Sequence, residues 1–210
     1  MSIAVIDYGM GNLRSVSKAL EHVAGKTPVV VTADPAVVAA AERVVFPGQG
    51  AMPDCMRELE ARGLSAAVLA AARQKPFLGI CVGEQMLFEH SEEGGVDGLG
   101  VFPGLVRRFP DERMVDAAGE RLKVPHMGWN NVRQQPHALW AGIADQARFY
   151  FVHSYYAAPA TPALTLATSD YGLPFTCAVG RDNIFAVQFH PEKSARDGLQ
   201  LLKNFVAWRP

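Results

Sequence analysis

The stretch Phe77-Leu78-Gly79-Ile80-Cys81-Val82-Gly83 decides the fold, because a short apolar run in it must turn straight into a helix. Residues 77–80 predict a buried strand, and residues 83–88 continue at helical spacing. A cysteine between two glycines at such a junction is the G-x-nucleophile-x-G elbow, with Cys in the place of Ser. The turn would lift the sulfur above the sheet, at the positive end of a helix dipole that favours thiolate. The alternative is a buried, inert cysteine beside two turn glycines.

Upstream of this elbow, short apolar strands alternate with helical patterns. Strands are expected at residues 3–6, 29–31, 44–46 and 77–80, and helices over 13–23, 52–62 and 64–73. This alternation predicts a parallel sheet covered by helices on both faces.

The pattern changes after about residue 92, where turn residues become frequent and the intervening helices vanish. Candidate strands, antiparallel or mixed, lie at 104–109, 122–125, 149–152, 164–169, 176–180 and 184–189, before an amphipathic helix over 198–208. No repeat or linker interrupts the chain. The sequence therefore predicts one α/β domain over residues 1–210, with a mixed, mostly parallel central sheet flanked by helices and additional antiparallel strands in the second half.

Bulk composition excludes several classes of partner. Twenty basic residues nearly balance twenty-one acidic ones, so the net charge of −1 gives no electrostatic case for nucleic acid or a membrane surface. The chain begins as a core strand rather than a signal peptide, so we expect a cytoplasmic location. Three widely spaced cysteines suggest neither disulfides nor a metal site, and we expect Cys55 and Cys177 to be inert. The segment 9–14 lacks the third glycine of a dinucleotide fingerprint, so no cofactor is indicated.

A thiol nucleophile needs a base, and a base usually needs an orienting group. In Phe189-His190-Pro191-Glu192, a strand brings His190 to the end of the sheet and Pro191 stops it there. Glu192 is close enough to bond the outer imidazole nitrogen, which leaves the other nitrogen facing Cys81. Alone, this tract would fit a strand-end histidine beside a solvated Glu-Lys pair equally well. The elbow favours the catalytic interpretation.

The elbow, the late His-Pro-Glu and the tract Pro47-Gly48-Gln49-Gly50 together resemble the class I (triad) glutamine amidotransferases, from the first strand to the last helix. The resemblance implies hydrolysis of L-glutamine to glutamate and ammonia, with Cys81 as nucleophile, His190 as base and Glu192 as orienting acid. It further implies an oxyanion hole from the backbone N–H groups of Gly50 and Val82, and glutamine-binding positions at Gln85, Ser154 and Tyr155. Gln49 and Glu84 depart from the apolar residues that the family often has there.

Three further tracts, at residues 7–13, 125–130 and 150–155, resemble the histidine-pathway branch of this family. Members of that branch form a heterodimer with a cyclase β/α barrel, which uses the ammonia to make imidazole glycerol phosphate. The resemblance implies a partner face with Asn12, Trp129, Tyr150 and Lys193, and structural or interface roles for His126 and His153.

Each partner-face residue also has an ordinary alternative. Asn12 could cap a helix, Trp129 could be core, Tyr150 could fill a strand face and Lys193 could be solvated. The rival functions are the glutaminase subunit of another ammonia-channelling synthase, a peptidase or gamma-glutamyl hydrolase, and a catalytically silent binding module.

Overall fold

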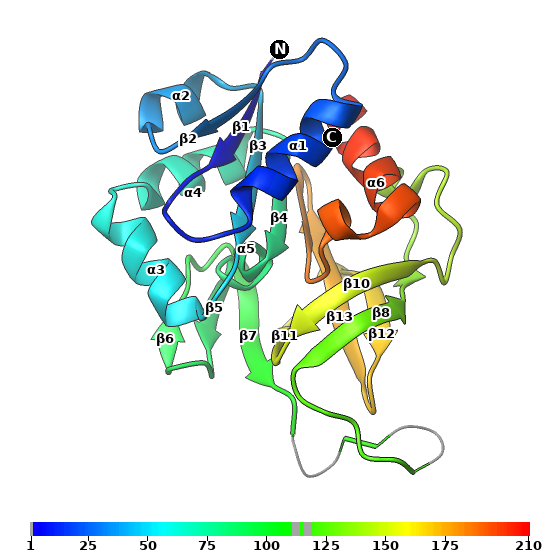
Figure 1. The fold of residues 1–210 in the computed structure, drawn as a ribbon. Helices are drawn as coiled ribbons and strands as arrows, with labels where there is room; N and C mark the ends of the chain where they lie inside the picture. The colour runs from blue at the N-terminus through cyan, green and yellow to red at the C-terminus, as the bar shows by residue number, and fades with distance from the viewer. Residues whose placement is uncertain (1, 111–113, 116–118) are drawn as a thin grey trace.

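A mixed sheet runs through the middle of the molecule and helices cover both of its faces (Figure 1). The computed structural model describes residues 2–110, 114–115 and 119–210. Helices α1 and α6 pack together on one face, and α2, α3 and α4 lie on the other (Figure 1). The helices are α1 (Leu13–Val23), α2 (Pro35–Ala40), α3 (Met52–Ala61), α4 (Ser65–Gln74), α5 (Val82–Gln85) and α6 (Ala195–Ala207), with 3₁₀ turns η1 (Ala138–Trp140), η2 (Pro162–Leu164) and η3 (Pro191–Lys193).

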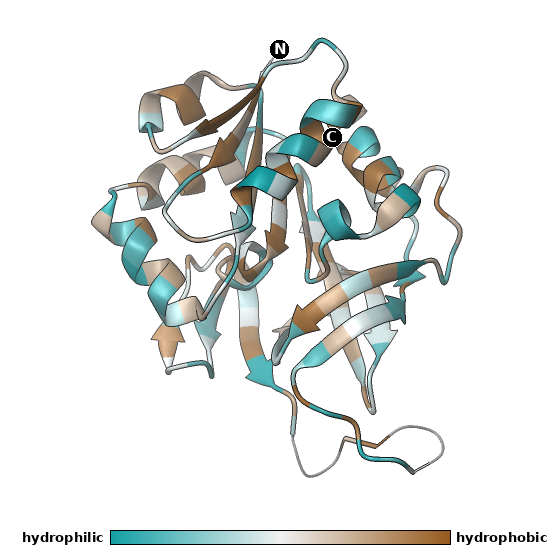
Figure 2. Cartoon of the chain, viewed as in Figure 1, coloured by the Kyte–Doolittle hydropathy of each residue, from teal (hydrophilic) through white to brown (hydrophobic). Residues whose placement is uncertain are grey.

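The first half of the sheet is parallel, as predicted. Its order is β2-β1-β3-β4-β14, where all neighbours run in the same direction. The strands are β1 (Ile3–Ile6), β2 (Val29–Thr32), β3 (Arg43–Gly48), β4 (Phe77–Cys81) and β14 (Ile184–Val187). Every residue of β1, β3, β4 and β14 is buried, which is why these strands are runs of apolar residues rather than alternating patterns. Figure 2 shows β1 as uniformly apolar, whereas α1 alternates between polar and apolar residues.

The second half continues the sheet with mostly antiparallel strands. Beyond β14 the order is β13-β11-β7-β5-β6, and β12 and β9 branch from β13. These strands are β5 (Phe88–Ser91), β6 (Val96–Asp97), β7 (Phe102–Arg108), β9 (Arg133–Gln134), β11 (Tyr155–Pro159), β12 (Thr165–Asp170) and β13 (Pro174–Arg181). The predicted fold class is thus confirmed.

A separate two-stranded ribbon lies in front of this half (Figure 1). It pairs β8 (His126–Asn131) with β10 (Arg148–His153) in antiparallel register, from His126 opposite His153 to Asn131 opposite Arg148. The predicted strand at 122–125 is wrong, because the strand of this region starts only after it, at His126. The sequence of β8 contains no β-branched residue, so its own propensity does not announce a strand.

The helix expected over 83–88 is also wrong in extent. Helix α5 ends after one turn, and Phe88 opens strand β5, which runs parallel to β7. All residues from 82 to 88 are buried, so their apolar spacing cannot distinguish a helix from a strand. Helix α2 went unpredicted, although Asp34 caps it by accepting from the Ala36 N–H at 2.8 Å and Pro35 occupies its first turn.

Within the described ranges, no helix is long and apolar enough to cross a membrane. The same residues contain no group of three His, Cys, Asp or Glu side chains placed to hold a metal ion.

Candidate active site

Cys81 ends the central strand β4 in a strained backbone conformation. Its φ of 56° and ψ of −116° lie in a region that side-chain-bearing residues rarely adopt. The surrounding glycines are required by packing. A Cβ on Gly83 would lie 2.0 Å from the Phe46 carbonyl oxygen, and one on Gly79 would lie 2.9 Å from the Ala186 Cβ. The elbow therefore fits only because its two glycines let α5 press against β3 and β14.

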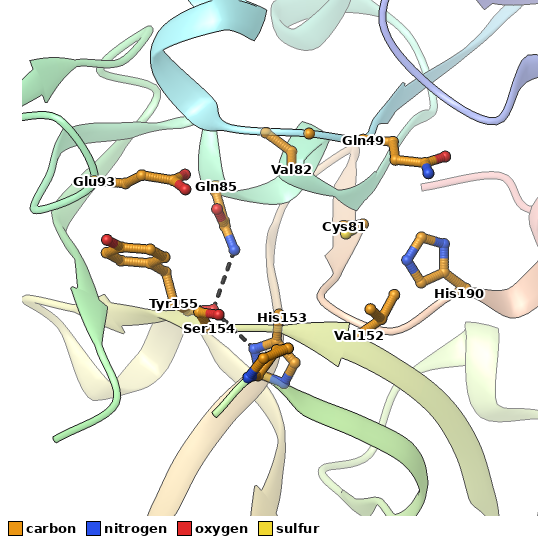
Figure 3. A pocket seen from close by; sticks show the side chains of 12 residues that line it. Gln49, Cys81, Val82, Gln85, Glu93, Val152, His153, Ser154, Tyr155 and His190 are labelled. Carbon is orange, nitrogen blue, oxygen red and sulfur yellow. Dashed lines mark hydrogen bonds between the residues drawn. The ribbon is translucent and has the colours of Figure 1, made fainter. Parts of the chain in front are cut away.

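His190 and Glu192 lie together and are withdrawn from solvent. The Nδ1 of His190 is 2.9 Å from Oε1 of Glu192, and the two side chains are 3% and 0% exposed. Glu192 is therefore not a solvated surface charge. The other ring nitrogen, Nε2, has no hydrogen-bond partner in the described part of the chain, and His190 faces Cys81 across the pocket (Figure 3).

The electrostatics favour a protonated His190. Burial alone would lower its pKa, but the Cys81 sulfur, followed by Glu192, outweighs burial and raises the pKa to about 10. A cationic imidazole stabilises negative charge on the sulfur. Helix α5 has only one turn, so its dipole is weaker than the sequence suggested.

Cys81 and His190 line a cavity of about 250 Å³ (Figure 3). The expected oxyanion residues Gly50 and Val82 line it, as do the expected glutamine-binding residues Gln85, Ser154 and Tyr155. The remaining lining residues are Gln49, Glu93, Pro125, Val152 and His153. The structure thus brings the expected triad, oxyanion and glutamine-binding residues from four separate tracts of sequence to one site.

The loop before Gly50 is held at both ends. Gly48 belongs to β3, pairs with Cys81, and a Cβ there would lie 2.6 Å from the Gly83 nitrogen. The Cys55 thiol donates to the Gln49 carbonyl at 3.6 Å, and burial raises the pKa of Cys55 to about 11, which keeps it protonated. Gly50 has a φ of +108°. The orientation of the peptide unit that carries the Gly50 N–H is thus tied to a buried thiol.

Two polar residues of the site were missed by sequence reasoning. Gln188, fully buried, donates from Nε2 to the Cys81 sulfur at 3.8 Å and accepts from Gln85 at 2.8 Å. The sequence feature that could have indicated Gln188 is its position two residues before His190, directly after strand β14. Glu93 brings a carboxylate to the cavity, where Oε2 accepts from the Met52 N–H at 2.8 Å. It lies in a polar turn that gives no sequence signal.

Glu84, the unusual residue of the elbow, points away from the cavity lining into the core. It is fully buried, and neither carboxyl oxygen has a hydrogen-bond partner among the described residues. Burial, and secondarily Cys81, raises the pKa of this carboxyl well above its ordinary value. These surroundings favour the neutral acid over a charged carboxylate beside Cys81.

The expected partner-face residues lie on neighbouring elements. Trp129 is 43% exposed rather than core, and its ring lies edge-on to Tyr150 with centroids 6.2 Å apart. Asn12 precedes α1 but makes no side-chain capping bond. Lys193 ends η3, which packs against both α1 and β10. The core alternative for Trp129 and the capping alternative for Asn12 are thus both excluded.

The sequence matches the glutamine amidotransferase class-I family over residues 4–208. It is 80% identical over 209 residues to "Imidazole glycerol phosphate synthase subunit HisH" of Dechloromonas aromatica, covering 100% of this chain and 97% of that protein. The protein of the same name from Aromatoleum aromaticum is 70% identical, with 99% of each chain covered. The structure of PurLQS from Thermotoga maritima has the same fold, with a TM-score of 0.71 at 18% identity over 98% of this chain and 97% of that one. The chain belongs to the class-I glutamine amidotransferase family.

Proposed function

We propose that the chain is the glutaminase subunit of imidazole glycerol phosphate synthase. It hydrolyses L-glutamine to glutamate and ammonia and passes the ammonia to a cyclase subunit, with which it forms a heterodimer. The observation that carries this proposal is the 80% and 70% identity, over essentially the whole chain, to proteins of that name. The buried Cys81, His190 and Glu192 supply the chemistry that the name requires.

The first chemical step is attack of the Cys81 sulfur on the side-chain amide carbon of glutamine. Negative charge develops on the amide oxygen, and the N–H groups of Gly50 and Val82 would stabilise it. One such donor is typically worth ~3 kcal/mol in the transition state. Both residues line the cavity beside Cys81, so the oxygen could reach them without leaving the sulfur.

His190 moves the protons in both halves of the reaction. As a cation it gives the Nε2 proton to the leaving nitrogen, which departs as ammonia and leaves a thioester on Cys81. The neutral imidazole then takes a proton from water as the water attacks the thioester, and glutamate is released. Glu192, bonded to Nδ1 at 2.9 Å, keeps the ring oriented and stabilises its charged form.

The cavity can recognise an amino acid as well as an amide. Glu93 offers a carboxylate to the α-ammonium group of glutamine, and Ser154 and Tyr155, which also line the cavity, offer backbone groups. At about 250 Å³ the space suits a small substrate and disfavours an extended peptide. This supports a glutaminase over a peptidase.

The ribbon β8–β10 is the proposed docking face for the cyclase. Met127 is 63% exposed, and it lies on the same face as Trp129 and Tyr150, opposite Val152. Tyr150 also contacts the catalytic segment through its backbone. Its carbonyl accepts from the His190 N–H at 2.9 Å, and its own N–H donates to the Ser194 hydroxyl at 3.0 Å. A partner on this face therefore acts one hydrogen bond from the base. The free thiols of the three cysteines fit the reducing cytoplasm.

The test is release of ammonia and glutamate by the chain alone, by the chain with its cyclase, and by the pair with the cyclase's nucleotide substrate. We expect little activity alone and strong activation by the loaded partner, with none in Cys81→Ser. A gamma-glutamyl peptide should be a poor substrate. Equal rates in all three states would remove partner control, and hydrolysis of the peptide in preference to glutamine would replace the proposed function with a hydrolase.

A further inference from the structure

The two faces of strand β8 carry different chemistry. Met127 and Trp129 point outward, whereas His126 is 3% exposed and lies beneath them. His126 is paired in register with His153 of β10, which is 6% exposed and lines the glutamine cavity. The mechanism above uses neither histidine, yet both sit between the proposed docking face and the substrate.

These side chains form a chain of hydrogen bonds that starts on β8. Asn130 Nδ2 lies 3.3 Å from His126 Nε2, and His126 Nδ1 lies 2.9 Å from His153 Nε2. His153 Nδ1 lies 2.8 Å from the Tyr155 carbonyl oxygen. Figure 3 shows the Tyr155 carbonyl accepting from His153 on one side and from Gln85 on the other.

The proton positions in this chain follow from its fixed ends. A carbonyl can only accept, so His153 carries its proton on Nδ1, and its Nε2 accepts from Nδ1–H of His126. Burial lowers the pKa of His126 to about 4, and burial with His126 nearby lowers that of His153 to about 3, so both rings are neutral. Asn130 must then donate to His126, in agreement with its second bond, to the Asp170 carbonyl at 2.7 Å. One assignment satisfies every group.

The chain continues to the nucleophile. Gln85 Nε2 donates to the Tyr155 carbonyl at 3.2 Å and to Gln188 Oε1 at 2.8 Å. This leaves the Gln188 amide nitrogen facing the Cys81 sulfur at 3.8 Å. Because the Tyr155 carbonyl accepts from both sides, donor direction reverses there and the chain cannot relay a proton. It can only hold positions.

We propose that His126 and His153 are positioning residues for the glutaminase reaction. They fix the Tyr155 carbonyl, and through Gln85 and Gln188 the Cys81 sulfur, relative to the strand that carries Met127 and Trp129. This rests on the proposed function in one respect, namely that the reaction positioned is glutamine hydrolysis driven by a partner on that face.

Paired substitutions at His126 test the bond rather than the bulk. Asn places an amide N–H near the Nδ1 position of histidine, whereas Gln places it near Nε2. His126→Asn should therefore keep the bond to His153 and His126→Gln should lose it, although Gln fills more of the vacated space. In the complex with cyclase and nucleotide, kcat/KM for glutamine should stay near the parent value in the Asn variant. It should fall roughly fivefold to tenfold in the Gln variant, the value of one buried hydrogen bond.

The same order is expected at His153, where Asn retains the bond to the Tyr155 carbonyl and Gln loses it. His126 is the cleaner position, because it does not line the substrate cavity. The control is His137→Gln, which alters a half-buried histidine that takes no part in these hydrogen bonds and should leave kcat/KM unchanged. Turnover of the cyclase with added ammonium salt should be equal in all variants, which shows that the cyclase is unimpaired. Co-elution of each variant with the cyclase in gel filtration shows that assembly is intact.

Alkylation of Cys81 by iodoacetamide in the isolated chain, followed by mass spectrometry of the Cys81 peptide, gives a second readout that does not need glutaminase activity. The rate of Cys81 alkylation should be the same in the parent and in His126→Asn, and lower in His126→Gln. If Asn and Gln variants behave alike, or Gln is the milder change, the histidines only fill space and the proposal is wrong. Absence of glutaminase activity in the parent complex would instead contradict the proposed function. The order of the Cys81 alkylation rates would then decide whether the histidines are positioning residues.

Discussion

Replacement of Glu192 by glutamine tests how much of the chemistry depends on one buried charge. The parent carboxylate is fully enclosed and bonded to His190 Nδ1 at 2.9 Å. In Glu192→Gln the amide can keep its oxygen toward the ring, which leaves a buried N–H₂ where Oε2 already has no partner among the described residues. Alternatively it rotates and donates to Nδ1, which forces the ring proton onto Nε2, facing the sulfur. Either arrangement weakens the base.

The magnitude follows from the environment of His190. The rise of its pKa from 6.5 to about 10 corresponds to about 5 kcal/mol in favour of the imidazolium, at 1.36 kcal/mol per pKa unit. Cys81 supplies the larger part of this stabilisation and Glu192 the smaller part, so loss of Glu192 costs up to about 2 kcal/mol, or up to about thirtyfold in rate. The wrong tautomer adds to that, so turnover should fall by roughly 10²–10⁴.

The assay is glutamate production by the complex with cyclase and nucleotide, at saturating glutamine. Asp197→Asn removes a carboxylate from the nearby first turn of α6 and serves as the matched control, with an unchanged rate expected. Cyclase turnover with added ammonium salt should be equal in parent and variant. A rate for Glu192→Gln within threefold of the parent would refute the reasoning, because a buried, hydrogen-bonded charge would then contribute nothing to the reaction.

Four other changes have defined outcomes. Cys81→Ala should abolish glutamine hydrolysis while the cyclase still turns over on ammonium salt; residual hydrolysis near the parent rate would identify another nucleophile. Lys193→Glu should weaken activation by the cyclase more than it alters the idle rate of the isolated chain, and the opposite pattern would remove it from the partner face. Cys55→Ala should change the ratio of glutaminase activity without the cyclase to that with it more than Cys55→Ser, which keeps a donor for the oxyanion loop. Equal ratios in the two variants would show that the thiol contributes packing and not a hydrogen bond. The folded pKa values of His126 (about 4) and His153 (about 3) lie below the unfolded value of 6.5, so the stability that the two neutral rings contribute is fully present above pH 6.5 and is lost as the pH falls toward 4. Urea unfolding should therefore show a free energy of unfolding that is lower at pH 5 than at pH 7 by about 2 kcal/mol per histidine. Equal free energies at the two pH values would contradict the neutral pair.

The tracts proposed as catalytic could be located from sequence because each is local. The elbow needs its glycines within two residues of Cys81, and Glu192 lies two residues from His190, so short-range geometry is already implied by the spacing. The buried parallel strands were equally readable, because burial on both faces makes them uniformly apolar. What the spacing could not supply was the extent of α5, since seven consecutive buried residues carry no period.

Residues that reach the site through tertiary structure gave weaker signals. Glu93 enters the cavity only because the turn after β5 folds back over α3, where its carboxylate accepts from Met52. Gln188 meets Cys81 because β14 and β4 are adjacent in the sheet. Neither neighbourhood is encoded by residues close in sequence, so polar side chains that look ordinary in the sequence become the groups that surround Cys81.

The ribbon β8–β10 places the proposed docking face and the proposed positioning histidines on opposite faces of the same two strands. Side chains alternate between the faces of a strand, so Met127 and Trp129 point outward because His126 points inward. On β10 the same alternation sets Tyr150 outward and His153 inward, and the register pairs like with like: Trp129 with Tyr150, His126 with His153. A slip of one residue would bury the docking side chains and expose the histidines, so the register is strongly specified. In the proposed complex, a displacement of β8 by the partner would move both faces as one unit, and the hydrogen bonds beneath β8 would carry the displacement to the cavity beside Cys81.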